Sequence, residues 1–394
     1  MYLQCDVSRL LRRYKDKITH TGIDRVNLDY AKWVIRSGGG LCIQRGHQLQ
    51  TVSRAMGRVL LRPSNRARVF PPDMRRNKVI ALRRLLSSLA KLGGPVKSPA
   101  SAIVLNTSHA WLDRTDVWSW LIKRGSRVVP FIHDLIPIEF PEYARPIEKK
   151  RHELRIDNAL RHSAAIVVNS ECTHSSLAAY ADQTGLRLPP ILVAPLGQNL
   201  KVRPHEPIPE NGKPYFVFLG TIEPRKNHLL ILTVWREMVK RLGENTPRLI
   251  VAGRRGWECE QIVDLLDRCE QLRPHVTELN NAPDEEIATL LKGARALLLP
   301  SFAEGFGMPI QEALAAGTPV IASPLPTFLE IAGDIPEYAE PFDGAKWFDL
   351  IVDYAAYDSI RRREQLVRMD QFQETTWKSH FHQLESFLRS LPRK

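Results

Sequence analysis

Short apolar runs alternate with amphipathic stretches along the first 200 residues of the chain. Apolar runs of this length are typical of buried strands, and the amphipathic stretches are typical of helices that cover a sheet. The alternation therefore predicts βα units. The expected strands are Leu3–Val7, Ala102–Asn106, Val128–Ile132, Ala165–Asn169 and Ile191–Ala194, and the expected helices include Val26–Arg36, Asp113–Lys123 and Ile147–Arg161.

Residues 201–214 interrupt this pattern with four prolines and few apolar residues, and we interpret them as a linker. The alternation restarts directly after the linker. The expected strands of the second half are Tyr215–Leu219, Arg248–Ala252, Ala296–Leu299 and Val320–Ala322, and the expected helices are Leu229–Arg241, Asp284–Lys292 and Met308–Ala316.

The two halves predict an α/β protein with two facing Rossmann-like, doubly wound domains, at residues 1–200 and 215–370. Such sheets bind ligands beyond the carboxyl ends of their strands, so two facing domains enclose a cleft. Apolar residues at helical spacing from Trp377 to Leu391 predict a last helix within 371–394 that packs on one of the domains.

Length and composition agree with this organisation. The 394 residues exceed one ordinary core, and 43% apolar with 25% charged residues is typical of a globular protein. No apolar run approaches the roughly 18–20 residues that cross a bilayer, and the first residues lack the basic and apolar regions of a signal peptide. The five cysteines are scattered without a Cys-x-x-Cys pair, which favours neither a zinc site nor disulfides. We therefore expect a cytoplasmic protein.

The net charge of +13 is concentrated in the first half of the chain. Residues 1–200 hold 32 Lys and Arg against 15 Asp and Glu, whereas the remainder holds 24 against 28. A field of this sign attracts phosphates, whether in nucleic acid, in anionic lipid headgroups or in a pyrophosphate-linked substrate. The most basic part, 45–100, is predicted to be an insertion. It is either a surface that lies on anionic lipid or an ordinary solvated insertion.

The densest group of candidate site residues follows the strand that ends at Leu299. Gly305 and Gly307 let the backbone approach a ligand, and the start of the following helix presents unpaired N–H groups that bind phosphate. Glu304 lies in the loop and Glu312 lies about one turn inside the helix, where both can accept hydrogen bonds from hydroxyls. Phosphate and hydroxyls together describe a nucleotide-sugar.

A basic turn follows the first strand after the linker. Gly220 permits close backbone approach, Arg225 can bind phosphate through two N–H groups, and Lys226 adds a second positive charge. This pair suits a diphosphate leaving group, whose negative charge grows as the glycosidic bond breaks.

Two segments of the first half carry further candidates. His133 and Asp134 follow the strand Val128–Ile132, so we expect His133 in the site with Asp134 as its supporting neighbour. Gly22 and Arg25 lie between the first strand and the first helix, where they are expected to contact either donor phosphate or the acceptor.

The order Ser-x-x-Glu-Gly-Phe-Gly-x-Pro-x-x-Glu-Ala at 301–313 resembles the Glu-x7-Glu signature of family-4 retaining glycosyltransferases, which have the GT-B fold. Gly-Thr-x-x-Pro-Arg-Lys-Asn at 220–227 and His-Asp-x-x-Pro at 133–137 are similar to two further segments of that family. The loop before Val26 departs from the family pattern, because it holds one glycine where members often have two or three.

The resemblance implies a role for each matching residue. Glu304 faces the donor sugar, and the backbone amides of Gly305, Phe306 and Gly307 hold its hydroxyl and phosphate groups. Glu312 binds the ribose. Arg225 and Lys226 contact the diphosphate, and His133 lies near the transferred sugar.

The predicted function is thus a hexosyltransferase that retains the anomeric configuration, with a nucleotide-sugar donor and a glycan or lipid-linked acceptor in surface polysaccharide assembly. The resemblance favours GDP-mannose, and a UDP-sugar is the second choice. No Asp-x-Asp occurs in the sequence, so we expect neither a metal nor another cofactor. The basic half indicates a peripheral position on the inner face of the cytoplasmic membrane.

Two other classes stay open. A GT-B enzyme of another reaction type, such as a phosphorylase or epimerase, would share the architecture. A basic nucleic-acid-binding protein would use only the first half, but the sequence shows no nucleic-acid motif and no aromatic-interleaved basic platform, so nucleic acid is not expected as a partner.

Overall fold

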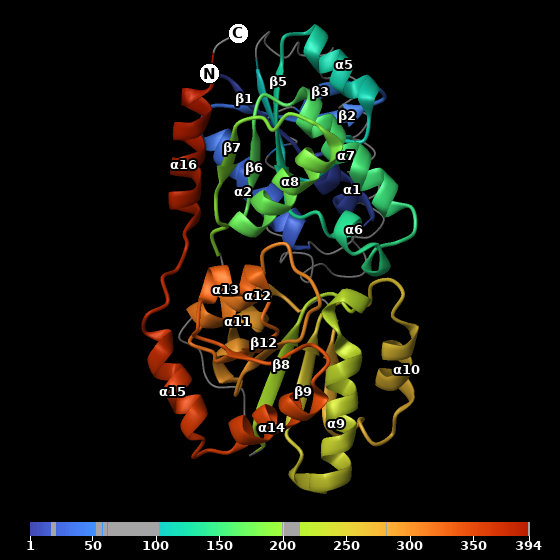
Figure 1. Cartoon of the computed structure of the whole chain (residues 1–394), viewed down its shortest axis with the longest axis vertical. Coiled ribbons are helices and arrows are strands. Elements are labelled where there is room, and N and C mark those ends of the chain that lie inside the picture. The colour runs from blue at the N-terminus through green and yellow to red at the C-terminus, as the bar shows by residue number, and fades with distance from the viewer. Residues whose placement is uncertain are drawn as a thin grey trace, which may run out of the picture.

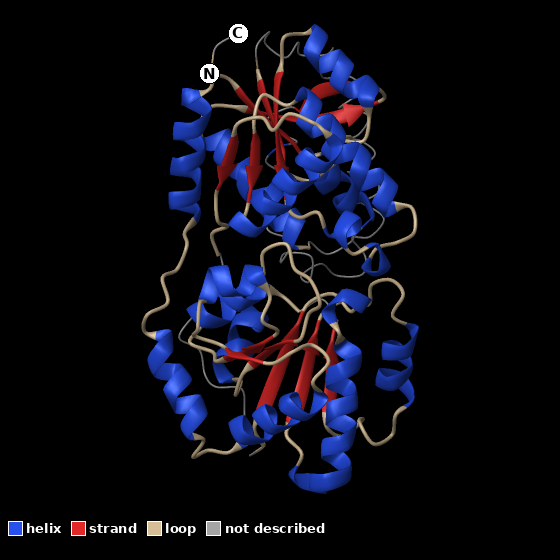
Figure 2. Cartoon of the chain, viewed as in Figure 1, coloured by secondary structure: helices blue, strands red, loops and turns tan. Residues whose placement is uncertain are grey.

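A computed structural model describes residues 1–16, 21–52, 57, 61, 102–198, 200, 213–280 and 282–392. It shows two α/β domains, one above the other along the long axis of the molecule, each with helices on both faces of a central sheet (Figure 1, Figure 2). The expected linker 201–214 lies outside the described residues up to 212, and so does most of the predicted insertion 45–100.

The first domain contains a seven-stranded sheet in the order β3-β2-β1-β4-β5-β6-β7. Its strands are β1 (Leu3–Asp6), β2 (Gly40–Arg45), β3 (Gln48–Val52), β4 (Ile103–Asn106), β5 (Arg127–Ile132), β6 (Ile166–Val168) and β7 (Ile191–Val193). All neighbours are parallel except β2 and β3, which form an antiparallel hairpin. Residues 48–52, which lie within the predicted insertion 45–100, form a strand at the edge of the sheet.

Helices cover this sheet on both faces. They are α1 (Ser8–Asp16), α2 (Gly22–Arg36), α5 (Thr115–Lys123), α6 (Ile136–Glu139), α7 (Glu148–His162) and α8 (Glu171–Thr184). Helix α2 begins four residues before the predicted Val26, because Asp24 accepts hydrogen bonds from the backbone N and the Oγ1 of Thr21, both at 2.8 Å. This cap places Gly22 and Arg25 in the first turn of the helix.

The second domain contains a six-stranded sheet in the order β10-β9-β8-β11-β12-β13, and every neighbouring pair is parallel. The strands are β8 (Tyr215–Leu219), β9 (Arg248–Ala252), β10 (Val276–Leu279), β11 (Leu297–Leu299), β12 (Val320–Ala322) and β13 (Glu337–Tyr338). The helices are α9 (His228–Leu242), α10 (Glu260–Arg268), α11 (Asp284–Gly293), α12 (Met308–Ala315), α13 (Pro326–Ala332), α14 (Gly344–Ala355) and α15 (Ile360–Met369).

The last helix, α16 (Trp377–Ser390), leaves the second domain and packs on the first (Figure 1). Its buried Leu384 and Leu388 join the apolar cluster formed by β1 and α2. His380 is hydrogen-bonded through Nε2 to the hydroxyl of Tyr30 at 2.8 Å, and its Nδ1 lies 2.9 Å from the carbonyl of Pro195. The end of the chain thus forms a second connection between the domains. None of the helices in the described part of the chain is long and apolar enough to cross a membrane.

Candidate functional site

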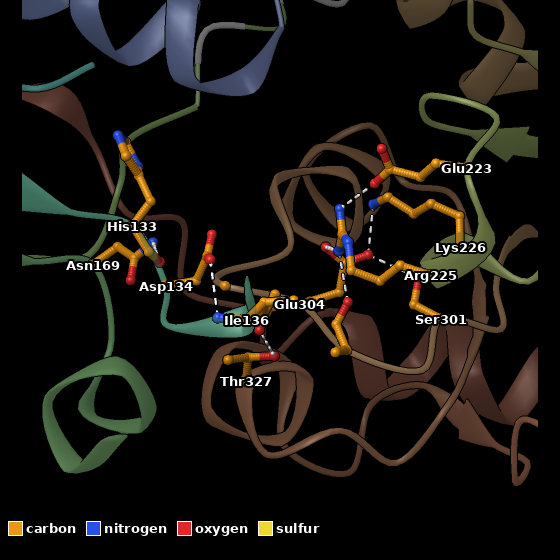
Figure 3. A network of polar contacts seen from close by, with 12 residues as sticks. His133, Asp134, Ile136, Asn169, Glu223, Arg225, Lys226, Ser301, Glu304 and Thr327 are labelled. Atoms are coloured by element: carbon orange, nitrogen blue, oxygen red, sulfur yellow. Dashed lines mark hydrogen bonds and ion pairs between the residues drawn. The ribbon is translucent and has the colours of Figure 1, made fainter. Parts of the chain in front are cut away.

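The loop between β11 and α12 places Glu304 in a cluster of ion pairs (Figure 3). Its Oε2 lies 2.6 Å from Nη1 of Arg225, and its Oε1 lies 2.5 Å from Nζ of Lys226 and accepts from the hydroxyl of Ser301 at 2.7 Å. Burial alone would raise the pKa of Glu304, but the two cations and the hydrogen bonds lower it to about 2. The carboxylate is therefore ionised at neutral pH.

Arg225 and Lys226 come from the turn after β8, on the neighbouring strand. Arg225 also pairs with Glu223 at 2.6 Å and donates to the carbonyl of Ala303 at 2.6 Å. Burial opposes its charge, yet Glu304 and Glu223 raise the pKa of Arg225. Gly220 has φ +153°, and a side chain there would begin 3.3 Å from Cε of Lys226. The glycine therefore leaves room for the lysine that reaches Glu304.

The residue before helix α12 is a glycine whose backbone conformation disfavours any other residue. Gly307 has φ +103°, and a Cβ would lie 2.6 Å from the ring of Phe328. The helix carries Glu312 about one turn further on, buried and 2.6 Å from Nη2 of Arg25 in the first domain. The structure thus brings together Glu312 and Arg25, which the sequence had assigned to separate parts of the site.

The rest of the glycine-rich loop lies against the first domain. A Cβ on Gly305 would come within 2.6 Å of the carbonyl oxygen of His133, so only glycine fits this approach. The hydroxyls of Ser170 and Thr173 donate to the carbonyl of Gly305 at 3.4 and 3.3 Å. Phe306 is buried in the apolar cluster of the first domain. These contacts join the predicted donor loop to the segment that holds His133.

Gly22 meets the second domain as well. A Cβ at this position would be 3.4 Å from Sδ of Met308, the first residue of α12. The first turn of α2 and the first turn of α12 are therefore neighbours across the domain boundary.

His133 faces the interior of the first domain, and its ring points away from the Glu304 cluster (Figure 3). Its Nε2 lies 2.8 Å from the carbonyl of Thr107. Because a carbonyl can only accept, Nε2 carries the proton. Burial lowers the pKa of His133, so the ring is neutral at pH 7.

Asp134 was expected to be the supporting neighbour of His133. Its Oδ1 accepts from the backbone N–H of Ile136 at 3.1 Å, at the start of α6, and its charge favours the protonated form of the His133 ring. Among the described residues the partner of the His133 ring is Thr107 and not Asp134. Asp134 thus shapes the turn that follows β5.

Several residues near the site were not found in the sequence. Glu223 and Ser301 hold Arg225 and Glu304. Glu223 is an unspecified position of the motif at 220–227, and Ser301 begins the motif at 301–313 but was given no role. Glu330 of α13 accepts from the backbone N–H groups of Glu171 and Cys172, at 2.8 and 3.1 Å, and so caps α8 from the other domain. A contact of this kind leaves no local signal in the sequence.

Asp6 was not predicted as a site residue either. It lies at the carboxyl end of β1, is fully buried, and accepts from the hydroxyl of Ser8 at 2.5 Å. Burial raises the pKa of Asp6 to about 6. Within the described ranges, no three His, Cys, Asp or Glu side chains are grouped as metal ligands.

Comparison with known proteins agrees with the motifs. Residues 202–335 match the sequence model of the family described as Glycosyl transferases group 1. The O-antigen chain mannosyltransferase B of Escherichia coli is 30% identical over 235 residues, which cover 57% of this chain and 60% of that protein. The O-antigen chain mannosyltransferase RfbU of Salmonella typhimurium is 34% identical over 139 residues, which cover 34% and 36%. The chain thus aligns with less than two thirds of each of these relatives.

Solved structures resemble the whole chain. Anabaena Alr3699/HepE in complex with UDP and glucose superimposes with a TM-score of 0.66 at 14% identity, covering 99% of this chain and 100% of that one. The sucrose-phosphate synthase of Thermosynechococcus elongatus gives a TM-score of 0.62 at 17% identity and covers 99% of both chains. The prediction of two doubly wound domains with the GT-B arrangement is confirmed, as is the resemblance to glycosyltransferases.

Proposed function

We propose that this chain, whose residues 202–335 belong to the glycosyl transferases group 1 family, transfers a hexose from a nucleoside-diphosphate sugar to a glycan or lipid-linked acceptor. The observation that carries the proposal is the cluster of Glu304, Arg225 and Lys226 at the carboxyl ends of β8 and β11. Mannose is favoured as the sugar, with GDP-mannose as donor, because the relatives include O-antigen mannosyltransferases.

The charges of the cluster fit a diphosphate ester. Arg225 and Lys226 bring two positive charges to the end of β8, and the start of α12 adds a partial positive charge. Glu304 and Glu223 compensate the charges of the two cations. A bound diphosphate would take over that compensation, so that Glu304 could accept hydrogen bonds from the hydroxyls of the sugar.

The expected reaction transfers the anomeric carbon from one oxygen to another. The bond from that carbon to the diphosphate oxygen breaks while a bond to the acceptor hydroxyl oxygen forms on the same face of the sugar. The leaving diphosphate takes the proton of the acceptor hydroxyl. Arg225 and Lys226 stabilise the charge that develops on the diphosphate. Glu304 and Glu312 both lie on one element, the loop and helix that follow β11, which argues against a glycosidase, whose paired carboxylates lie on either side of the scissile bond.

Donor binding tests the proposal directly. The midpoint of thermal unfolding is measured with GDP-, UDP-, ADP- and dTDP-linked sugars in the presence of EDTA, on the wild type, Glu312→Ala and Glu286→Ala. Glu286 is an exposed residue of α11 and serves as the control. One donor is expected to raise the midpoint of the wild type and of Glu286→Ala, with a smaller effect on Glu312→Ala. A folded protein that responds to none of the donors would refute the proposed function.

Product analysis separates the two alternative reactions. Transfer releases a nucleoside diphosphate in amounts equal to the new glycosidic bond. Orthophosphate-dependent breakdown of a glycan would indicate a phosphorylase, and interconversion of two sugar-nucleotides would indicate an epimerase.

The proposed place of action is the cytoplasmic face of a membrane. Support comes from the charge of 45–97, where 13 basic residues accompany one acidic residue. Cosedimentation with vesicles that contain anionic lipid, at low and high salt, tests this part. Equal binding to neutral and anionic vesicles, or none to either, would contradict it.

A further inference from the structure

One ion pair of the site crosses the boundary between the domains. Arg25 in the first turn of α2 reaches Glu312 of α12, with Nη2 and Oε1 2.6 Å apart. The Glu312 side chain is only 3% exposed, and that of Arg25 is 22% exposed. The arginine therefore covers the carboxylate from the side of the first domain.

This pair differs from those of Glu304 in the origin of its partners. Arg225 and Lys226 belong to the same domain as Glu304, so their ion pairs survive any movement of one domain against the other. The pair of Arg25 and Glu312 exists only while α2 lies against α12. Neither Nη2 of Arg25 nor Oε1 of Glu312 has a hydrogen-bond partner elsewhere among the described residues.

Neighbouring contacts show how closely the two helices meet. Gly22 lies next to Met308, and Gly305 approaches the backbone of His133 so tightly that a Cβ at this position would lie 2.6 Å from the carbonyl oxygen. Burial opposes the charge of Arg25, but Glu312 and then Asp284 raise its pKa, so the guanidinium stays charged. A charged arginine thus pairs with the buried carboxylate.

We propose that Arg25 is a positioning residue whose ion pair with Glu312 competes with the ribose of the donor for this carboxylate. The proposal rests on the proposed function, in which Glu312 accepts the ribose hydroxyls. Ribose binding and the ion pair between Arg25 and Glu312 then exclude each other.

Removing Arg25 has a definite expected sign. Without it, Glu312 is a buried carboxylate that no other cation of the described residues pairs with, which is unfavourable. Ribose hydroxyls that reach this carboxylate form charge-assisted hydrogen bonds and displace nothing. A nucleoside diphosphate should consequently bind more tightly to Arg25→Met than to the wild type, by about tenfold, since one such bond is worth about that factor.

The test compares nucleotides with and without ribose hydroxyls. Binding of GDP, UDP and their 2′,3′-dideoxy counterparts is measured by calorimetry on the wild type, Arg25→Met, Arg25→Lys and Arg36→Met. Arg36 is an exposed residue at the end of the same helix and is the matched control. We expect Arg25→Met to bind GDP or UDP about tenfold more tightly and the dideoxy form unchanged, Arg25→Lys to lie between, and Arg36→Met to behave as wild type.

Turnover provides the second readout. Arg25→Met should lower the KM for the donor while kcat stays equal or falls. A purely structural loss would instead raise KM. Unchanged or weaker binding of the ribose nucleotides by folded Arg25→Met and Arg25→Lys would overturn the proposal, and so would an equal gain for the dideoxy form. If the wild type itself binds none of the nucleoside diphosphates, the proposed function fails instead, so the two failures are distinguishable.

Discussion

Two groups of polar side chains, one in each domain, differ in kind. On the second domain, Glu304, Arg225 and Lys226 form an ionic face in which each charge pairs with an opposite charge. In the interior of the first domain, His109 and His133 lie with ring centroids 5.2 Å apart, and burial lowers the pKa of both, so they are neutral. The ionic face suits a charged diphosphate, whereas the neutral ring of His133 bonds to the backbone carbonyl of Thr107. The following substitutions test this division, from the largest expected effect to the smallest.

Glu304→Gln should have the largest effect, because it removes the negative charge that pairs with both Arg225 and Lys226 and replaces an acceptor oxygen for the sugar by an amide donor. Loss of a preorganised electrostatic group commonly lowers kcat by about a hundredfold to a thousandfold. We expect a loss in this range, measured as release of nucleoside diphosphate. Glu286→Gln, at the exposed start of α11, should keep wild-type activity. Activity of Glu304→Gln within threefold of wild type would remove the ionic face from the mechanism.

Asp6, buried at the end of β1 in the first domain, should make the stability of the protein depend on pH. Its pKa is raised from 3.8 to about 6, so the folded protein binds more protons than the unfolded chain between these values. The free energy of unfolding therefore falls as the pH rises through this window, by roughly 3 kcal/mol for this one group. Asp6→Asn removes this contribution.

Urea unfolding between pH 4 and pH 7 measures the difference between wild type and Asp6→Asn. The wild type should lose stability relative to the variant as the pH rises. Glu304 has the opposite sign, because its lowered pKa of about 2 contributes stability above the unfolded value that is lost as the pH falls from 4.5 towards 2. Parallel pH profiles of the wild type and Asp6→Asn would show that Asp6 is not buried as an acid.

Substitution of His133 should have a smaller effect on activity. Its neutral ring donates from Nε2 to Thr107, and a glutamine amide can replace this bond. We expect His133→Gln to keep about a tenth of the wild-type kcat and His133→Ala about a hundredth, since a buried partner is then left unpaired. The control is His382→Gln, on an exposed face of α16.

The pH profile decides between two roles of His133. If the ring stays neutral, the kcat of the wild type has no step near pH 6.5 that is due to His133. The pH profiles of kcat for the wild type and His133→Gln should then have the same shape. Such a step in the wild type would mean that the imidazole is protonated in the working enzyme, contrary to its burial.

The sequence predicted those parts of the site that are local along the chain. The order of strand, glycine-rich loop and helix at 297–315 identified Glu304 and Glu312, because each lies at a fixed distance from the end of β11. The ion pair between Arg25 and Glu312 joins residues far apart in sequence, and its existence depends on how the domains face each other. No periodicity or motif in one chain encodes that arrangement.

The hairpin of β2 and β3 was missed for a different reason. Its outer strand, Gln48–Val52, is half polar because it lies at the sheet edge and is covered on fewer sides. A pattern search for apolar runs finds central strands more readily than edge strands. The sequence around this strand is rich in arginine, and the strand was therefore included in the predicted basic insertion.

Ser301→Ala gives the smallest predicted effect and the sharpest test of how Glu304 is held. Ser301 is fully buried and donates to Oε1 of Glu304 at 2.7 Å, the same oxygen that pairs with Lys226. A hydrogen bond to a charged group contributes about 1.5–3 kcal/mol, but Lys226 remains to hold the carboxylate, so we expect a loss of kcat of only about threefold to tenfold.

The matched control is Ser323, which is buried after β12. Its hydroxyl has no hydrogen-bond partner in the described part of the chain, so Ser323→Ala should leave kcat unchanged. If both variants lose activity equally, packing rather than the bond to Glu304 explains the loss. If only Ser301→Ala does, the orientation of the carboxylate limits turnover, and the ionic face acts by the precise placement of its charges as well as by their number.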